Sequence, residues 1–169
     1  MSHLLAACSL TLEDGGTEDE AIAALLHDAV EDHGPKLLPV IRRRFGDDVA
    51  AIVEGCSDVL DVAEGGAKPP WRPRKEAYLA HLETATPGVL RVSNADKVHN
   101  ARAILADHRQ IGPTVWERFN PDARSAEAQL WYLDSLSKVF TRRRPESFLP
   151  AELRAAVDAL CLIAREREG

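Results

Sequence analysis

Apolar residues recur along this chain at intervals of three and four positions, and alternating apolar and polar stretches are scarce. The first spacing is that of an α-helix with one buried face, whereas alternation would have indicated β-strands. Glycine and proline interrupt the pattern at Gly15–Gly16, Gly34–Pro35, Gly46 and Pro87–Gly88. The pattern therefore predicts an all-α protein, which we expect to form a single helical domain over residues 1–169.

The first two expected helices are separated by Gly15–Gly16. The predicted buried face of the first helix consists of four apolar residues, Leu4, Leu5, Cys8 and Leu12. Thr17 and Glu20 have the spacing of a capping box, which predicts that the second helix begins there. We expect that helix to continue to Gly34–Pro35, because glycine and proline commonly end a helix.

Further helices are expected along the rest of the chain. Apolar residues at helical spacing place them at residues 37–45 and 49–53, around Tyr78, at 89–105, from Asn120–Pro121 to Phe140, and from about Pro150 onward. Three aromatic residues at helical spacing are expected in the core, namely Trp116, Trp131 and Tyr132. Three histidines are expected at the surface or at helix ends, namely His33, His81 and His108.

The composition is that of an ordinary soluble protein, with 45% hydrophobic and 28% charged residues. The sequence contains no apolar run of the roughly 20 residues that a membrane span needs, and no recognisable secretory leader. Its three cysteines are an odd number without C-x-x-C spacing, which argues against a disulfide framework and a thiolate zinc site. We therefore expect a cytoplasmic protein that does not contact a membrane.

The net charge of −6 bears on the possible partners. Non-specific binding to nucleic acid depends on an excess of Lys and Arg, so an acidic protein is not expected to bind DNA or RNA in this way. A local basic cluster on an acidic protein can still bind a small anionic molecule. The net charge is therefore compatible with a small anionic substrate.

Polar residues interrupt the second expected helix in the stretch LLHDAVEDHG, residues 25–34. His27 and Glu31 are four positions apart, as are Asp28 and Asp32, so each pair would share a helix face. One interpretation is a solvated helix end, although carboxylates near a helix C-terminus oppose the helix dipole. The other is a site in which these groups surround an ion. This stretch alone supports the two interpretations about equally.

A second polar cluster lies in SNADKVHNAR, residues 93–102. Asp96 and Asn100 are four positions apart in a helix whose apolar residues indicate that it faces the core. A buried carboxylate is costly without a partner, and one divalent cation can partner several carboxylates at once. Two such interruptions suggest that two helices meet across a common pocket.

Together these motifs resemble the HD superfamily of metal-dependent phosphohydrolases, and more narrowly the hydrolase domain of the RelA/SpoT proteins and small alarmone hydrolases. The resemblance rests on HDAVED, on ADKVHNAR, on His3 in MSHLLAACSL, and on PPWRPRKEAYLAHL. It covers about residues 2–140 and implies an HD-type helical bundle with a metal site between its helices. Family members usually carry a helix before the first histidine. We therefore expect His3 to lie in an exposed first turn, either because this sequence begins downstream of the true start or because the protein is truncated.

The resemblance also implies roles for individual residues. The metal ligands would be His3, His27, Asp28 and Asp96. This set of nitrogen and oxygen ligands suits Mn²⁺, with Fe²⁺ or Mg²⁺ as alternatives. Glu31 and Asp32 would orient or deprotonate the water that attacks the substrate. Asn100 would contact the substrate, and His99 would support the fold or the surroundings of the metal.

The implied reaction is hydrolysis of the 3′-pyrophosphate of guanosine tetra- or pentaphosphate to GDP or GTP and pyrophosphate. Five basic residues are candidates for phosphate contacts, namely Lys97, Arg102, Arg72, Arg74 and Lys75. One alternative is an HD phosphohydrolase acting on another nucleotide, such as NADPH or a deoxynucleotide. Another is a module that binds a nucleotide or metal without turnover, although such a module would not need the acidic pair.

Overall fold

The structure of the chain, a computed structural model, describes residues 1–58 and 70–166, with side chains up to residue 164. It is all-α, as the sequence predicts, and the described residues contain no strand. The α-helices are α1 (Ser2–Glu13), α2 (Glu18–Leu26), α3 (Ala29–His33), α4 (Leu38–Phe45), α5 (Asp47–Cys56), α6 (Trp71–Leu82), α7 (Pro87–Ile111), α8 (Ala126–Arg143) and α9 (Leu149–Glu166). Three short 3₁₀ helices are η1 (Pro35–Leu37), η2 (Gly112–Arg118) and η3 (Pro121–Ala123).

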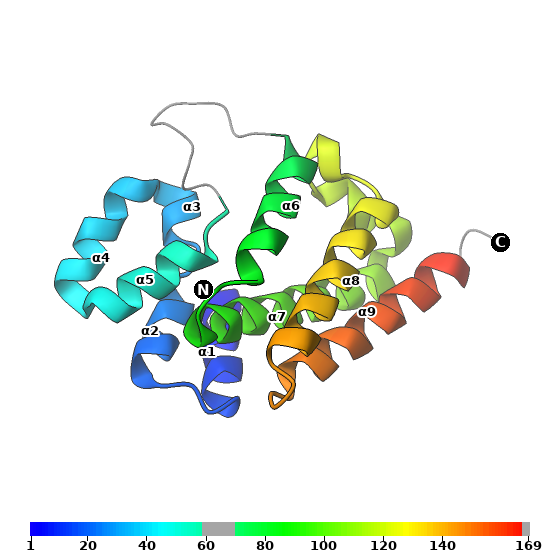
Figure 1. The fold of residues 1–169 in the computed structure, drawn as a ribbon. Coiled ribbons are helices and arrows are strands. Elements are labelled where there is room, and N and C mark those ends of the chain that lie inside the picture. Colours follow the sequence, from blue (N-terminus) through cyan, green and yellow to red (C-terminus); the bar gives the residue numbers. More distant parts are fainter. Residues whose placement is uncertain (59–69, 167–169) are drawn as a thin grey trace.

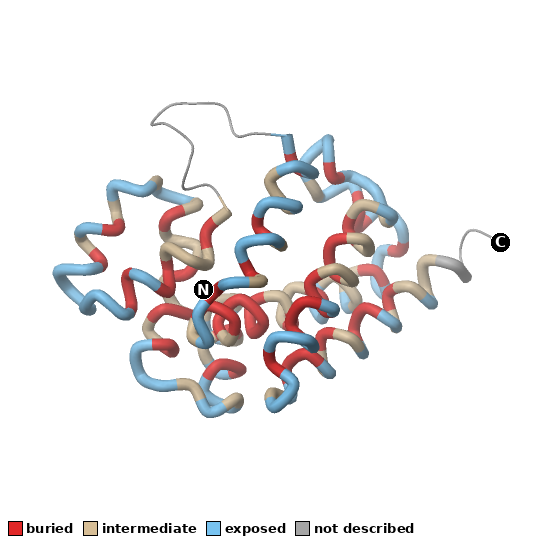
Figure 2. The backbone as a smooth tube through the Cα atoms, in the orientation of Figure 1, coloured by how far each residue is buried: buried red, intermediate tan, exposed pale blue. Residues whose placement is uncertain are grey.

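Helix α7 is the centre of the fold. It packs against α1, α2, α5, α8 and α9, whereas α4 lies farther away, beyond α5 (Figure 1). Four of its apolar residues are completely buried, namely Val92, Ala95, Val98 and Ala101. Figure 2 shows this buried stretch beneath the helices on either side. Asp96 lies within it, so α7 holds a carboxylate at the middle of the molecule. None of the described helices combines the length and the apolar character that crossing a membrane requires.

The second helix begins as predicted but ends earlier. The Thr17 hydroxyl accepts from the backbone amide of Glu20 at 3.3 Å, and the Glu20 carboxylate accepts from the amide of Thr17 at 2.7 Å, which completes the capping box. The predicted continuation to Gly34 is wrong, because α2 ends at Leu26 and α3 begins at Ala29. His27 and Asp28 therefore lie at a break between two helices.

The predicted buried face of α1 is wrong in part. Leu5 and Leu12 are 57% and 52% exposed, whereas Ala7, Leu10 and Thr11 are buried. Helix α1 packs against α2 and α7 through this second face. Small side chains allow helix backbones to approach closely, which explains why Ala7 and Thr11 face the core although leucines were available elsewhere on the helix.

Two later predicted helix boundaries also need correction. Helix α7 runs from Pro87 to Ile111 and is longer than the predicted range 89–105. Helix α8 begins at Ala126, where the Ser125 hydroxyl accepts from the amide of Ala128 at 3.0 Å, and not at Asn120–Pro121, which leads into η3. His108 lies in the last turn of α7, one of the two predicted kinds of position, but it is 1% exposed and packs near the ring of Trp116.

The expected positions of the three aromatic residues and of the other two histidines are confirmed. Trp116 and Tyr132 are buried, Trp131 is half-buried against the core, and His33 and His81 are exposed.

A buried ionic cluster fixes the end of the molecule opposite the polar residues of α3. The Asp14 carboxylate, 3% exposed, accepts hydrogen bonds from Arg91 at 3.2 Å and from Arg144 at 3.0 Å. Its other oxygen accepts from Ser147 at 2.6 Å, and Arg91 also pairs with Glu20. The cluster joins the turn after α1 to α7 and to the turn between α8 and α9.

Replacing Asp14 by alanine is expected to destabilise the fold by about 3 kcal/mol, because the buried Arg144 loses its buried carboxylate partner and keeps its ion pair with the exposed Glu146. Urea unfolding measures this loss of free energy. The matched control is Glu152→Ala, which removes an exposed ion pair with Arg102 and should cost less than about 1 kcal/mol. Equal losses for the two variants would show that the buried cluster does not stabilise the fold.

A candidate metal centre and an adjacent pocket

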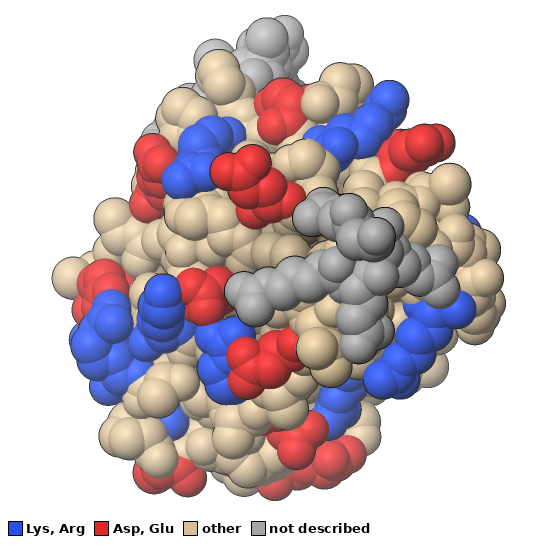
Figure 3. Space-filling model, turned by 90° about the vertical axis from the view of Figure 1, so that its right-hand side faces the viewer, with Lys and Arg blue, Asp and Glu red and all other residues tan. Residues whose placement is uncertain are grey.

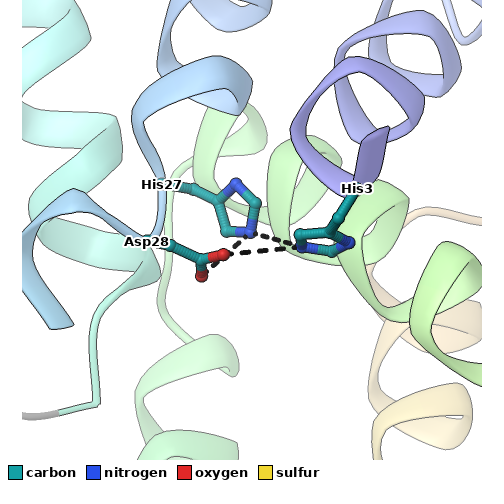
Figure 4. A group of neighbouring side chains, drawn as sticks. All are labelled: His3, His27 and Asp28. Atoms are coloured by element: carbon teal, nitrogen blue, oxygen red, sulfur yellow. Dashed lines mark hydrogen bonds and ion pairs between the residues drawn. The ribbon is translucent and has the colours of Figure 1, made fainter. Parts of the chain in front are cut away.

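Four side chains from three parts of the chain converge beside α7. His3 lies in the first turn of α1, His27 and Asp28 lie at the break between α2 and α3, and Asp96 lies on α7. Figure 4 shows His3, His27 and Asp28 pointing toward one another. The structure thus brings together all four residues that the resemblance implied as metal ligands.

The ligand atoms lie close to one another. The Nε2 atom of His27 is 3.2 Å from Nε2 of His3 and 3.1 Å from Oδ1 of Asp28. The Oδ1 atom of Asp96 is 3.2 Å from Nε2 of His3 and 3.5 Å from Nε2 of His27. Ligands held about 2.1 Å from one ion lie about 3 Å apart when adjacent. The spacing and the donor types therefore fit a single divalent cation.

Both imidazole rings are held through the nitrogen that faces away from this point. The Nδ1–H of His27 donates to the carbonyl of Ala24 at 2.8 Å. Nδ1 of His3 is hydrogen-bonded to Nδ1 of His99 at 2.9 Å. Each ring consequently presents Nε2 to the cluster, as a metal-ligating histidine does when its other nitrogen is fixed by a partner.

The two carboxylates of the cluster dominate the electrostatics around His27. Burial alone would lower the pKa of His27, but the carboxylates of Asp28 and Asp96 outweigh it and raise that pKa to about 10. Burial would raise the pKa of Asp96, but Lys97 and the two histidines hold it well below its usual range. A proton is thus retained on His27 between two carboxylates, at the point where a cation would have the same partners.

The two residues of the predicted acidic pair, Glu31 and Asp32, have different surroundings in the structure. Glu31 is half-buried; burial raises its pKa, and the charges of Asp58 and Asp28 raise it further against the opposing effect of nearby lysines. Asp32, the next residue of the short helix α3, is exposed. Glu31 is therefore the acidic residue whose surroundings match those of a group that transfers protons.

Asp58 is a functional candidate that the sequence did not indicate. Its side chain is 3% exposed, and its Oδ2 atom accepts from Arg74 at 2.5 Å and from Lys75 at 2.6 Å. It follows α5 directly in the chain, in a stretch without a recognisable motif. The contacts with Arg74 and Lys75 come from α6, so only the fold brings the three together.

The predicted substrate-binding residues do not all lie at the same place. Lys97 pairs with the Oδ2 atom of Asp96, and Asn100 donates to its Oδ1 atom at 2.6 Å. Both also line a pocket of about 340 Å³. Arg102 is exposed and pairs with Glu152 of α9, away from the pocket lining.

The pocket combines basic, amide and aromatic side chains. Lys75, which also pairs with Asp58, lines it together with Lys97. Arg74 and Arg72 are not among its lining residues; Arg74 pairs with Asp58, and Arg72 lies over the ring of Trp131 at 3.2 Å. Its aromatic walls are Trp71, Phe119 and Tyr132, and Asn120 and Gln129 also line it. The buried hydroxyl of Tyr132 has no hydrogen-bond partner among the residues that the structure describes. Such a pocket can hold an anionic molecule with a flat ring.

Comparison with known proteins identifies a family. The HD domain family (HD_4) matches residues 1–119. Curated relatives include a probable GTP pyrophosphokinase from Mycobacterium leprae, 34% identical over 104 residues, and a GTP pyrophosphokinase from Streptomyces coelicolor, 34% identical over 106 residues. These alignments cover 62% of this chain but only 13% and 12% of the relatives' own length.

A solved structure shares the fold. The crystal structure of lmo0812 from Listeria monocytogenes EGD-e superposes with a TM-score of 0.76 at 25% sequence identity, covering 92% of this chain and 96% of that one. Together with the family match over residues 1–119, this similarity confirms the HD-type helical fold that the motifs led us to expect. The chain therefore belongs to the HD domain family and is similar to the RelA/SpoT type within it.

Proposed function

We propose that this HD domain hydrolyses the 3′-pyrophosphate of guanosine tetra- or pentaphosphate, releasing pyrophosphate and GDP or GTP. The main support is the convergence of two imidazoles and two carboxylates beside a pocket whose lining includes two lysines and three amide side chains. Both curated relatives are named for the transfer of pyrophosphate to GTP. A guanosine nucleotide that carries an added pyrophosphate is the substrate that we propose.

His3, His27, Asp28 and Asp96 would hold the cation, for which we propose Mn²⁺, with Fe²⁺ or Mg²⁺ as alternatives. When bound there, such an ion acidifies water and offsets the charge of phosphoryl oxygens. The two rings contribute their Nε2 atoms because Ala24 and His99 occupy their Nδ1 atoms. The chain itself therefore fixes the orientation of these ligands.

The remaining groups would handle the proton and the substrate. Glu31 would accept the proton of the attacking water, since burial raises the pKa of its carboxyl toward the range useful for proton transfer. Lys75 and Lys97 would neutralise phosphate charge, and Asn100 would hydrogen-bond the nucleotide next to the metal ligands. Tyr132 would offer its buried hydroxyl to the substrate while its ring packs beside it.

The surface charge supports a small substrate in preference to a nucleic acid. Figure 3 shows Lys and Arg interspersed with Asp and Glu on one face of the molecule. Binding along a nucleic-acid backbone depends on a continuous stripe of positive charge. Lys97 lies instead beside Asp96, and Lys75 lines the same pocket, where the phosphates of one nucleotide could reach both lysines.

The reaction is tested with the purified protein, Mn²⁺ and guanosine tetraphosphate. We expect GDP and pyrophosphate in equal amounts, measured by anion-exchange chromatography and a coupled pyrophosphate assay. NADPH and a set of deoxynucleoside triphosphates are run beside it at equal concentration. Faster phosphate release from one of these would reject the guanosine substrate, and binding of the tetraphosphate without product would reject hydrolysis.

A further inference from the structure

His99 lies on α7 three positions after Asp96 and is half-buried. Its Nδ1 atom is 2.9 Å from Nδ1 of His3, and the two ring centroids are 4.9 Å apart with the rings tilted by 53°. The opposite nitrogen of His3, Nε2, is 3.2 Å from Oδ1 of Asp96. The imidazole of His3 is therefore bonded at both ends by residues of α7.

His3 has less local support than the other members of the cluster. His27 is 4% exposed and donates to a carbonyl of the preceding helix α2, and Asp96 is bonded by two neighbours on α7. The side chain of His3 is 27% exposed, and α1 begins at Ser2 without a side-chain cap. The first turn of a helix is where a chain frays most readily. The orientation of His3 thus depends on a partner from another helix.

We propose that His99 is a positioning residue that holds His3 in the orientation and tautomer needed to bind a divalent cation. Nε2 of His3 can offer a lone pair to the cation when Nδ1 carries the proton. That proton is then donated to Nδ1 of His99, whose own proton lies on Nε2. The inference rests on the metal centre of the proposed function and adds a residue to it that does not itself touch the ion.

The size of the effect follows from this indirect role. Loss of a partner that orients a metal-ligating histidine typically lowers metal affinity about 10- to 100-fold. His99→Ala should therefore weaken Mn²⁺ binding by about this factor while leaving the helices intact. His99→Gln should recover most of the affinity, because its amide oxygen can accept the same hydrogen bond from His3.

The experiment measures the affinity of the full chain for Mn²⁺ alone, from the electron paramagnetic resonance signal of the free ion. His81→Ala, which removes an exposed histidine of α6, is the control and should bind like the wild type. The decisive comparison repeats His99→Ala in a His3→Ala background. We expect no further loss of affinity there, because His99 acts through His3. Circular dichroism checks that each variant is folded.

Three outcomes would overturn the inference. Unchanged affinity in His99→Ala would show that His3 is held without it. An equal loss with and without His3 would show that His99 supports the helices generally, and a failure of His99→Gln to recover affinity would argue against the hydrogen bond. The absence of Mn²⁺ binding by the wild type would instead reject the metal centre as a whole. A wild type that binds Mn²⁺ without hydrolysing the nucleotide would reject the proposed reaction alone.

Discussion

Replacing Asp28 by asparagine is expected to remove bound Mn²⁺ and to lower pyrophosphate release by at least about a thousandfold. The substitution keeps the shape of the side chain but removes one of the two negative charges that face His3 and His27. Without the cation, the attacking water would keep its high bulk pKa, which a favourable metal site lowers to about 7. The nucleophile would then be scarce at neutral pH.

Asp28 is the most informative of the proposed ligands to change because its side chain is 41% exposed. Asp96 is buried and is the partner of Lys97, so its replacement would also leave a buried lysine without its carboxylate. The measurements are the Mn²⁺ content after dialysis and the rate of pyrophosphate release. Asp47→Asn, which removes an 88% exposed carboxylate, is the control and should change neither. Retention of Mn²⁺ by Asp28→Asn would remove Asp28 from the ligand set.

Glu31→Gln is expected to lower kcat by about 10²- to 10⁴-fold while leaving the affinity for Mn²⁺ close to that of the wild type. The amide cannot accept the proton of the attacking water, but Glu31 is not among the groups that converge on the candidate ion site. Asp32→Asn should have a smaller effect, because Asp32 is exposed. A larger loss for Asp32→Asn than for Glu31→Gln would reverse the assignment of the base.

The pH profile tests the same role. Burial and the charge of Asp58 raise the pKa of Glu31, so the wild-type rate should fall as the pH decreases through that raised value, where the carboxyl becomes protonated. Asp58→Asn removes the neighbouring negative charge and should move this acidic limb to lower pH. The rate measured across the pH range in saturating Mn²⁺ gives the comparison. An acidic limb that stays in place would show that another group is the base.

The sequence predicted much of this molecule, for identifiable reasons. The helical spacing of apolar residues and the capping box at Thr17 depend only on residues close together in the sequence. Both are found in the structure. The four residues that converge were indicated by motifs, in which both the residue types and their order along the chain carry information. His3 could be named in advance because the resemblance supplied it, whereas spacing alone would not have linked it to Asp96.

Other features depended on tertiary packing. The spacing of α1 was compatible with more than one buried face, and the choice of Ala7 over Leu5 was made by the close approach of α1 to its neighbours. Lys97 and Arg102 are five positions apart, about 140° around the helix, so a motif containing both could not place both in one pocket. Tyr132 has the spacing of a core residue, and only the fold shows that it also forms a pocket wall.

A crystal of the protein grown with Mn²⁺, measured at the manganese absorption edge, would show whether a single cation is bound at the cluster. We expect one anomalous peak within about 2.3 Å of Nε2 of His3, Nε2 of His27 and a carboxylate oxygen each of Asp28 and Asp96. A peak coordinated by other residues, or no peak at these four side chains in saturating Mn²⁺, would contradict the metal centre from which the proposed chemistry follows.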